Sequence, residues 1–179
     1  MKTQETKWAI DPSHSKVAFK VKHLMISNVL GNFKEFEGQV NSDENDFSGA
    51  VINFSLNTAS IDTEIADRDA HLKSADFFDA EKYPKITFAG NGMKDLGDDI
   101  YELTGDLTIK EVTKSVTLAV EFGGVNSDPW GNVKAGFSIN GKINRKDFGL
   151  NWNAALEAGG VLVGEEVKIS GDVELVKVS

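Results

Sequence analysis

The sequence contains no cysteine, and this absence excludes several kinds of chemistry at once. Disulfides, thiolate metal ligands and a cysteine nucleophile are all ruled out, so any catalysis or metal binding needs other side chains. Proline is also scarce, with 3 among 179 residues, and no apolar run is long enough to span a membrane as a helix. Few prolines and 17 glycines suit a chain of many strands joined by turns.

Positive charge is in short supply as well. Against 28 acidic residues stand 19 lysines and arginines, which gives a net charge of −9. This balance argues against nucleic acid and against an anionic membrane surface as electrostatic partners. Residues 1–7 lack the apolar stretch of a signal peptide, so the chain as written is expected to be cytoplasmic. The alternative is a periplasmic or secreted protein from which a signal peptide was removed.

The dominant feature of the chain is alternation of apolar and polar residues. Tyr101–Ile109 alternates without an error, as expected for a strand with one buried face. The same pattern recurs in segments 17–23, 36–40, 52–58, 86–88, 116–122, 133–143 and 167–175. About eight strands of this type are typical of an antiparallel sheet that is closed into a barrel or folded into a sandwich.

Four of these segments carry a glycine where the alternation requires a large inward-facing side chain. The four are Gly38, Gly105, Gly141 and Gly171. Glycine inside a strand marks a bulge, a bend, or a close approach by a ligand or another backbone. A barrel needs such kinks to close, and missing side chains leave interior volume unfilled. We therefore predict a sheet curled around an interior space that the glycines keep open.

One segment breaks the strand pattern. Between Asp62 and Phe78, apolar Ile65 and Leu72 recur at helical spacing with Arg68 between them. This spacing predicts a helix of about three turns. A single helix in an all-β protein would cross an open end of the barrel as a lid or plug.

Several motifs follow one another over nearly the whole chain. They are Trp8-x-Ile-Asp-Pro-x-His14-Ser15, His23-Leu24-Met25, Gly31-x-Phe33, Ser60-Ile61-x-Thr63, Arg68-Asp69-x-His71-Leu72, Asp76-Phe77-Phe78, Tyr83-Pro84-x-Ile86-x-Phe88, Trp130-Gly131 and Asn144-Arg145-x-Asp147-Phe148-Gly149-Leu150. In this order they resemble the YceI-like family. The resemblance implies an eight-stranded antiparallel, lipocalin-like barrel, with one helix inserted near residues 62–78, as a single bacterial domain over residues 1–179. It also implies an elongated tunnel that holds a polyisoprenoid or another long amphiphile.

A tunnel for a long hydrocarbon needs a continuous apolar lining and a bore that side chains do not block. The residues predicted to line it are Phe19, Val21, Ile52, Phe54, Leu56, Phe88, Leu103, Gly105, Leu107, Phe137, Ile139, Gly141 and Gly171. Periodicity establishes a buried face and not a cavity, so one alternative remains. These side chains would then fill a solid core, and the glycines would only bend the strands.

Three polar residues fall close to the predicted apolar face. His23 ends an inward-facing run, and Arg68 and His71 are neighbours on the predicted helix. Together they are candidates to hold an anionic head group such as a pyrophosphate, for which arginine offers two parallel hydrogen bonds. The alternative is structural, with His23 bonded to backbone and Arg68 paired with Asp67, Asp69 or Asp147.

Signals for catalysis and for metals are weak. The chain has no nucleophile elbow and no glycine-rich phosphate loop. Its three histidines, His14, His23 and His71, match no metal-ligand spacing, so no metal site is predicted. Arg145 and Asp147, at positions i and i+2, are expected to form a salt bridge and not a catalytic pair.

Two classes of function follow. The predicted one is non-catalytic binding or carriage of a long-chain amphiphile, such as a polyisoprenoid, an isoprenoid quinone or a fatty-acid-like lipid, with no cofactor besides that molecule. The alternative is an enzyme acting on an isoprenoid-type ligand, with His23, Arg68 and His71 as acid, base or anion-binding groups. Neither class excludes a homodimer.

Overall fold

The computed structural model describes residues 5–44, 46–154, 156 and 162–178. Over these residues the strands are β1 (Glu5–Ile10), β2 (Lys16–His23), β3 (Ser27–Phe33), β4 (Phe36–Asp43), β5 (Asp46–Asn57), β6 (Ile61–Asp62), β7 (Lys85–Gly97), β8 (Ile100–Ile109), β9 (Val112–Ser127), β10 (Val133–Asn144) and β11 (Val163–Lys177). The helical elements are α1 (Ala66–Lys73) and three short 3₁₀ turns, η1 (Pro12–His14), η2 (Thr58–Ser60) and η3 (Arg145–Phe148).

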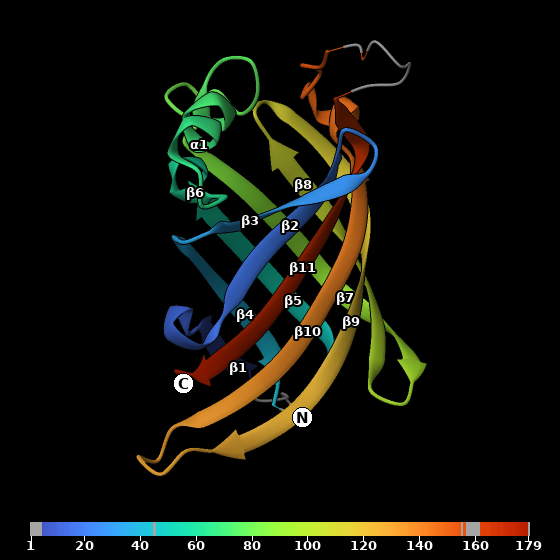
Figure 1. Cartoon of the computed structure of the whole chain (residues 1–179). Coiled ribbons are helices and arrows are strands. Elements are labelled where there is room, and N and C mark those ends of the chain that lie inside the picture. The colour runs from blue at the N-terminus through green and yellow to red at the C-terminus, as the bar shows by residue number, and fades with distance from the viewer. Residues whose placement is uncertain (1–4, 45, 155, 157–161, 179) are drawn as a thin grey trace.

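Eight strands close into an antiparallel barrel (Figure 1). Their order is β1-β4-β5-β7-β8-β9-β10-β11, and β1 pairs back onto the C-terminal part of β11, with Trp8 opposite Lys177 and Ile10 opposite Leu175. The predicted eight-stranded antiparallel barrel is therefore confirmed. Closure removes the exposed edges that an open sheet would have.

Three further strands extend the wall at one end of the barrel. The N-terminal part of β11 pairs with β2, β2 pairs with β3, and β3 pairs with β6 over two residues. Both β1 and β2 thus lie along the same edge of β11, and η1 separates them. The 3₁₀ turn forms because Pro12 suits its first position and the Asp11 side chain accepts a hydrogen bond from Ser13 N. The strands β1, β3 and β6 were not predicted, because their short sequences do not alternate clearly.

The end of the barrel nearest the two termini, which we call the termini end, is closed by aromatic side chains. The ring of Phe47 lies 5.4 Å from Trp8, 5.4 Å from Phe122 and 4.9 Å from Phe137, measured between centroids. Trp8 is 1% exposed, and its Nε1 donates to Ser42 Oγ at 2.9 Å. This cluster blocks the interior at the termini end.

The predicted helix lies where expected, at the opposite end of the barrel, which we call the helix end (Figure 1). It is shorter than the predicted three turns. Glu64 adopts a positive φ of 68° and Ile65 is extended, so the helix begins at Ala66. Beyond Ser74 the chain continues in tight turns. None of the helices in the described ranges has the length or apolar character needed to cross a membrane.

Candidate functional site

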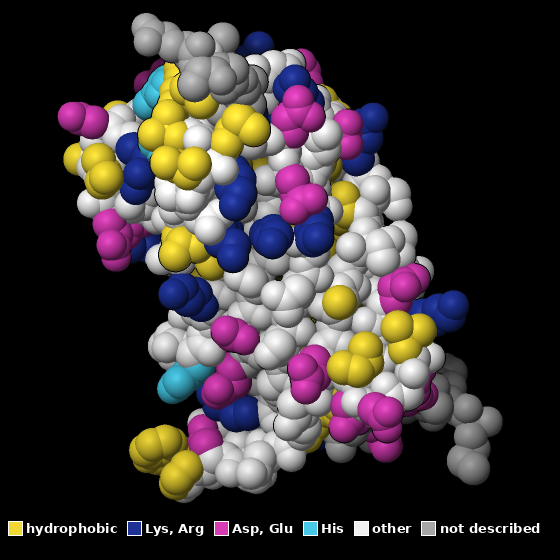
Figure 2. Space-filling model, turned by 45° about the vertical axis from the view of Figure 1, so that its right-hand side comes forward, with side chains coloured by type: hydrophobic (Ala, Val, Ile, Leu, Met, Phe, Trp, Pro, Cys, Tyr) yellow, Lys and Arg dark blue, Asp and Glu magenta, His cyan; other side chains and the backbone are white. Residues whose placement is uncertain are grey.

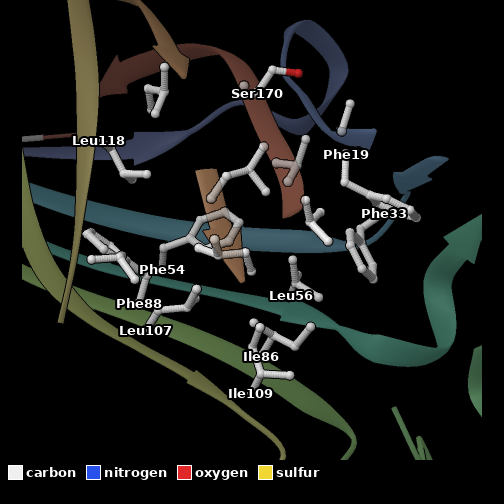
Figure 3. Close-up of a pocket in the computed structure, with 18 of the residues that line it drawn as sticks. Phe19, Phe33, Phe54, Leu56, Ile86, Phe88, Leu107, Ile109, Leu118 and Ser170 are labelled. Atoms are coloured by element: carbon white, nitrogen blue, oxygen red, sulfur yellow. The ribbon is translucent and has the colours of Figure 1, made fainter. Parts of the chain in front are cut away.

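The interior of the barrel is hollow. A cavity of about 410 Å³ runs through it, and inward-facing side chains from the barrel strands, β2, β3 and α1 line it (Figure 3). Small-molecule sites in proteins range from about 300 to 1,000 Å³, so this volume suits a small ligand or one hydrocarbon chain. The lining is almost entirely apolar, as Phe19, Leu56, Ile86 and Leu107 illustrate in the close-up (Figure 3).

The predicted lining residues lie around this cavity with two exceptions. Those that line it are Phe19, Val21, Ile52, Phe54, Leu56, Phe88, Leu103, Leu107, Phe137, Ile139 and Gly171. The exceptions are Gly105 and Gly141. The interior is therefore a cavity and not the solid core of the alternative interpretation. That these residues contact a ligand stays a prediction.

Most interior glycines do not keep space open, contrary to the prediction. At Gly105 the ring of Phe88 lies over the position that a Cβ would take, and Ala89 O is 2.6 Å from that position. At Gly141 the position is occupied by the end of Leu118, and at Gly38 by the end of Ile10. Large side chains from neighbouring strands cover the glycines, so these glycines permit close packing.

Gly171 behaves differently. It lines the cavity, and the nearest atoms to an added Cβ are Lys16 O at 3.5 Å, Val173 Cγ2 at 3.8 Å and Ile139 Cβ at 3.9 Å. These are ordinary van der Waals distances. Among the glycines predicted to keep the interior open, Gly171 is thus the one at which the absent side chain leaves usable volume.

The polar residues predicted for a head-group site all lie at the helix end, but among the described residues no hydrogen bond or aromatic contact joins His23 to Arg68 or His71. His23 ends β2, Arg68 and His71 lie on α1, and all three line the cavity. Arg68 is held by the segment before its own helix: Nε donates to Thr63 Oγ1 at 2.8 Å, and Nη2 donates to Thr63 O at 2.7 Å. Its partner is therefore Thr63 and not one of the three aspartates of the structural alternative.

The His71 ring sits in a partly aromatic environment. It lies 5.1 Å from Phe77 and 4.7 Å from Trp152 between ring centroids, in edge-on contact with both. Its Nε2 is 2.9 Å from Asp76 Oδ2. This pairing orients the ring, whose side chain is 38% exposed. In the part of the chain that the structure describes, the His23 side chain has no hydrogen-bond partner.

Arg145 is a lining residue that the sequence did not predict. It is 3% exposed, and its guanidinium donates to four backbone carbonyls, those of Leu150, Trp152, Val163 and Gly164. Burial lowers the pKa of Arg145, but a guanidinium still remains charged. The predicted salt bridge to Asp147 is wrong, because both residues lie on the 3₁₀ turn η3, which buries Arg145 and exposes Asp147.

The remaining histidine, His14, lies in η1, away from His23 and His71. His14 forms a group with Asp11 and Glu174 that is close enough to hold a metal ion. The ammonium of Lys134 already occupies this position, at 2.8 Å from Asp11 Oδ2 and 3.2 Å from Glu174 Oε1. Hydrogen bonds from Lys134, Ser13 and His14 hold the pKa of Asp11 well below its usual range. The cluster is an ion-pair network at the start of β2.

Comparisons with known proteins agree with this architecture. A family model for the YceI-like domain matches residues 8–175. A UPF0312 protein of Staphylococcus epidermidis is 43% identical over 170 residues, which cover 94% of this chain and 96% of the relative. A UPF0312 protein of Staphylococcus aureus is 41% identical over the same shares of the two chains.

Solved structures share the fold. Burkholderia cenocepacia BcnA matches with a TM-score of 0.80 and 25% identity, over 92% of this chain and 98% of that one. The Campylobacter jejuni YCEI protein matches with a TM-score of 0.75 and 35% identity, over 89% and 91%. A polyisoprenoid binding domain from Saccharophagus degradans matches with a TM-score of 0.67 over 96% and 98%, and its 12% identity makes it a likeness of fold alone.

Proposed function

Because the chain belongs to the YceI-like family, we propose that it binds a long-chain amphiphile inside the barrel and does not transform it. The observation that carries this proposal is the cavity, which is apolar along its length and bordered at the termini end by the Phe47 cluster. Polar and cationic groups gather at the helix end. An amphiphile would place its hydrocarbon chain in the apolar part and its head group at the helix end.

The volume of the cavity supports a single hydrocarbon chain. A methylene group takes roughly 27 Å³ at liquid-like packing, so 410 Å³ accommodates about fifteen carbons. Each buried methylene contributes about 0.8 kcal/mol, or about 12 kcal/mol for a full cavity before the costs of ordering are subtracted. Atoms beyond this length would extend through the helix end.

The charges at the helix end favour an anionic head group. Within the described residues, neither Arg68 nor Arg145 has a carboxylate within 4 Å, and the acidic group that interacts with the charge of Arg145 from farther away is Glu165. Both already hydrogen bond to backbone carbonyls, which orients them. A carboxylate or phosphate beside them would be stabilised by charge.

The non-catalytic part of the proposal rests on where the titratable groups lie. His23 and His71, the candidate acid and base, stand at the helix end, whereas the part of the cavity that would hold the chain is lined by hydrocarbon side chains. No cofactor is part of the proposal. The polyisoprenoid binding named for the Saccharophagus degradans domain supports the ligand class only through the shared fold.

The proposal is tested by extracting the natively purified protein with organic solvent and identifying the released molecules by mass spectrometry. We expect a long-chain amphiphile in a fixed ratio to protein. The stripped protein is then reloaded with this molecule and incubated. Recovery of an unchanged ligand supports a carrier, conversion of the ligand identifies an enzyme, and failure of the stripped protein to take up any long-chain molecule contradicts the proposal.

A further inference from the structure

The hairpin between β2 and β3 exposes large apolar side chains. Leu24, Met25 and Ile26 at its tip are 39%, 57% and 82% exposed, and Leu30 on β3 is 66% exposed. We call these four residues the apolar patch. Single apolar residues are common on protein surfaces, but several on one hairpin are typical of a binding surface.

The turn holds two of these residues in a backbone conformation that bulky side chains avoid. Leu24 has a φ of 54° and Met25 a φ of 63°, and Ile26 N donates to His23 O at 3.2 Å. Two successive residues at positive φ are characteristic of a type I′ turn, for which Asn-Gly is the favoured sequence. Leu-Met destabilises such a turn, so the stability of the hairpin does not explain these residues.

The apolar patch adjoins the helix end of the cavity. Leu24 N donates to Leu162 O at 2.8 Å, and both Leu162 and His23, the residue before the turn, line the cavity. A hydrocarbon chain that leaves the cavity at this end would emerge beside the hairpin tip.

A row of lysines crosses the outer face of the barrel next to the hairpin. Lys142 on β10 is opposite Lys168 on β11, and Lys168 is opposite Lys20 on β2. Figure 2 shows hydrophobic side chains gathered in the upper part of the molecule and a row of lysine or arginine side chains below them. Among the residues with described side chains, no carboxylate lies within 4 Å of these three ammonium groups.

Such a row is unexpected in a chain with a net charge of −9. Like charges directly opposite each other on neighbouring strands destabilise a sheet. An anionic partner bound across the row would remove this repulsion. The positive charge is confined to the row itself, because Glu166 and Asp172 lie on the same outer face of β11 on either side of Lys168, and Figure 2 shows acidic side chains above and below the row.

The geometry points to docking of this face on a lipid bilayer that carries anionic headgroups. The apolar patch would insert between the lipids, and the lysines would bind headgroup phosphates, as in other proteins that combine apolar and basic surface elements. This inference rests on the proposed function, because a carrier of a long hydrocarbon must exchange it with a membrane. Docking beside the helix end of the cavity would let the chain pass between bilayer and barrel without crossing water.

The test uses the full chain and two kinds of vesicle, one of phosphatidylcholine and one of equal parts phosphatidylcholine and phosphatidylglycerol. Bound protein is measured by co-sedimentation. We expect binding to the mixed vesicles, and a Lys20→Gln/Lys168→Gln variant should weaken it by about fivefold for each lysine. Equal binding of the wild-type protein to both vesicles would overturn the role of the lysines.

The apolar patch is tested by a double substitution, Leu24→Asn/Met25→Gly, which installs the preferred type I′ sequence. Vesicle binding should fall about tenfold or more, while the thermal midpoint stays the same or rises. The control is Trp130→Ser, because Trp130 is 83% exposed in the turn between β9 and β10, at the termini end (Figure 1). Binding by the double variant that equals that of the wild type would overturn the inference.

A second measurement separates this inference from the proposed function. Uptake of a fluorescent fatty acid from aqueous solution, without vesicles, should be equal in the wild type and the Leu24→Asn/Met25→Gly variant. If the wild-type protein takes up no fatty acid, and the double variant loses vesicle binding, the results contradict the proposed function and support docking. Loss of uptake in a folded variant would contradict a role confined to docking.

Discussion

Filling the cavity at Gly171 should shorten the chain that the protein can hold. An added Cβ at this position has no neighbour closer than 3.5 Å, so the substitution Gly171→Leu is expected to fold and to point its side chain into the cavity. Gly141 does not offer this opportunity, because Leu118 already occupies the corresponding space. Gly171→Leu therefore probes the ligand site with little disturbance of the packing.

The size of the effect follows from the volume. A leucine side chain has four carbons, which take roughly 100 Å³, or about a quarter of the 410 Å³ cavity. The variant should hold about four methylenes fewer. At about 0.8 kcal/mol each, the loss is about 3 kcal/mol, or about a hundredfold in Kd, for a chain long enough to fill the cavity.

The assay is displacement of a fluorescent probe by saturated fatty acids of increasing length. For the wild type, affinity should rise up to about fifteen carbons and then level off; for Gly171→Leu it should level off about four carbons earlier. The matched control is Gly49→Leu, because Gly49 is exposed on β5 and has no atom within 4 Å of an added Cβ. If folded Gly171→Leu protein binds long chains as tightly as the wild type, the chain does not lie in this cavity.

Three further predictions concern access, the buried arginine and the ion-pair network. Amide exchange in 66–72 should be faster than in 103–109 without ligand and should slow when ligand is added, because lids belong to the less stable parts of a fold; equal exchange with and without ligand would make α1 a fixed wall. Arg145→Met should lower the free energy of unfolding by about 3 kcal/mol or more, because it leaves four carbonyls without their donor. Lys146→Met, which removes an exposed ion pair with Glu165, should cost less than about 1 kcal/mol, and similar losses in the two variants by chemical denaturation would contradict this role of Arg145. Asp11→Asn should destabilise the protein by about 1 kcal/mol at neutral pH. Since the folded-state pKa of Asp11 is lowered, this contribution is present above the unfolded pKa of about 4 and disappears as the pH falls toward the folded value. A difference in the free energy of unfolding between wild type and Asp11→Asn that does not shrink below about pH 4 would refute it.

The alternation of residue types carried most of the local information. A strand exposes successive side chains on opposite faces, so the period of two in segments such as Tyr101–Ile109 identified both the strands and the residues that face inward. For this reason all but two of the predicted lining residues lie around the cavity. The helical spacing around Arg68 likewise located α1, although a positive φ at Glu64 set its start.

The space inside the barrel could not be read from the same pattern. Whether a glycine leaves a void depends on the side chain that the neighbouring strand places over it, and that neighbour is set by strand register. Gly105 and Gly171 have the same phase in their strands, yet the ring of Phe88 occupies the Cβ position at the first, whereas the atoms nearest to that position at the second are 3.5 Å or more away. Arg145 was misassigned for a related reason, since its carbonyl partners at Val163 and Gly164 come from a distant part of the chain.

Contacts between distant segments also created the closed wall and the charged face. Pairing of Trp8 with Lys177 closes the barrel across almost the full length of the chain, and no local signal marks these residues as partners. Lys20 and Lys168 are unremarkable outward-facing residues in their own strands. They form a row because the pairing of β2 with β11 sets them opposite each other. The row of positive charge proposed to bind anionic lipid therefore follows from strand register and not from composition.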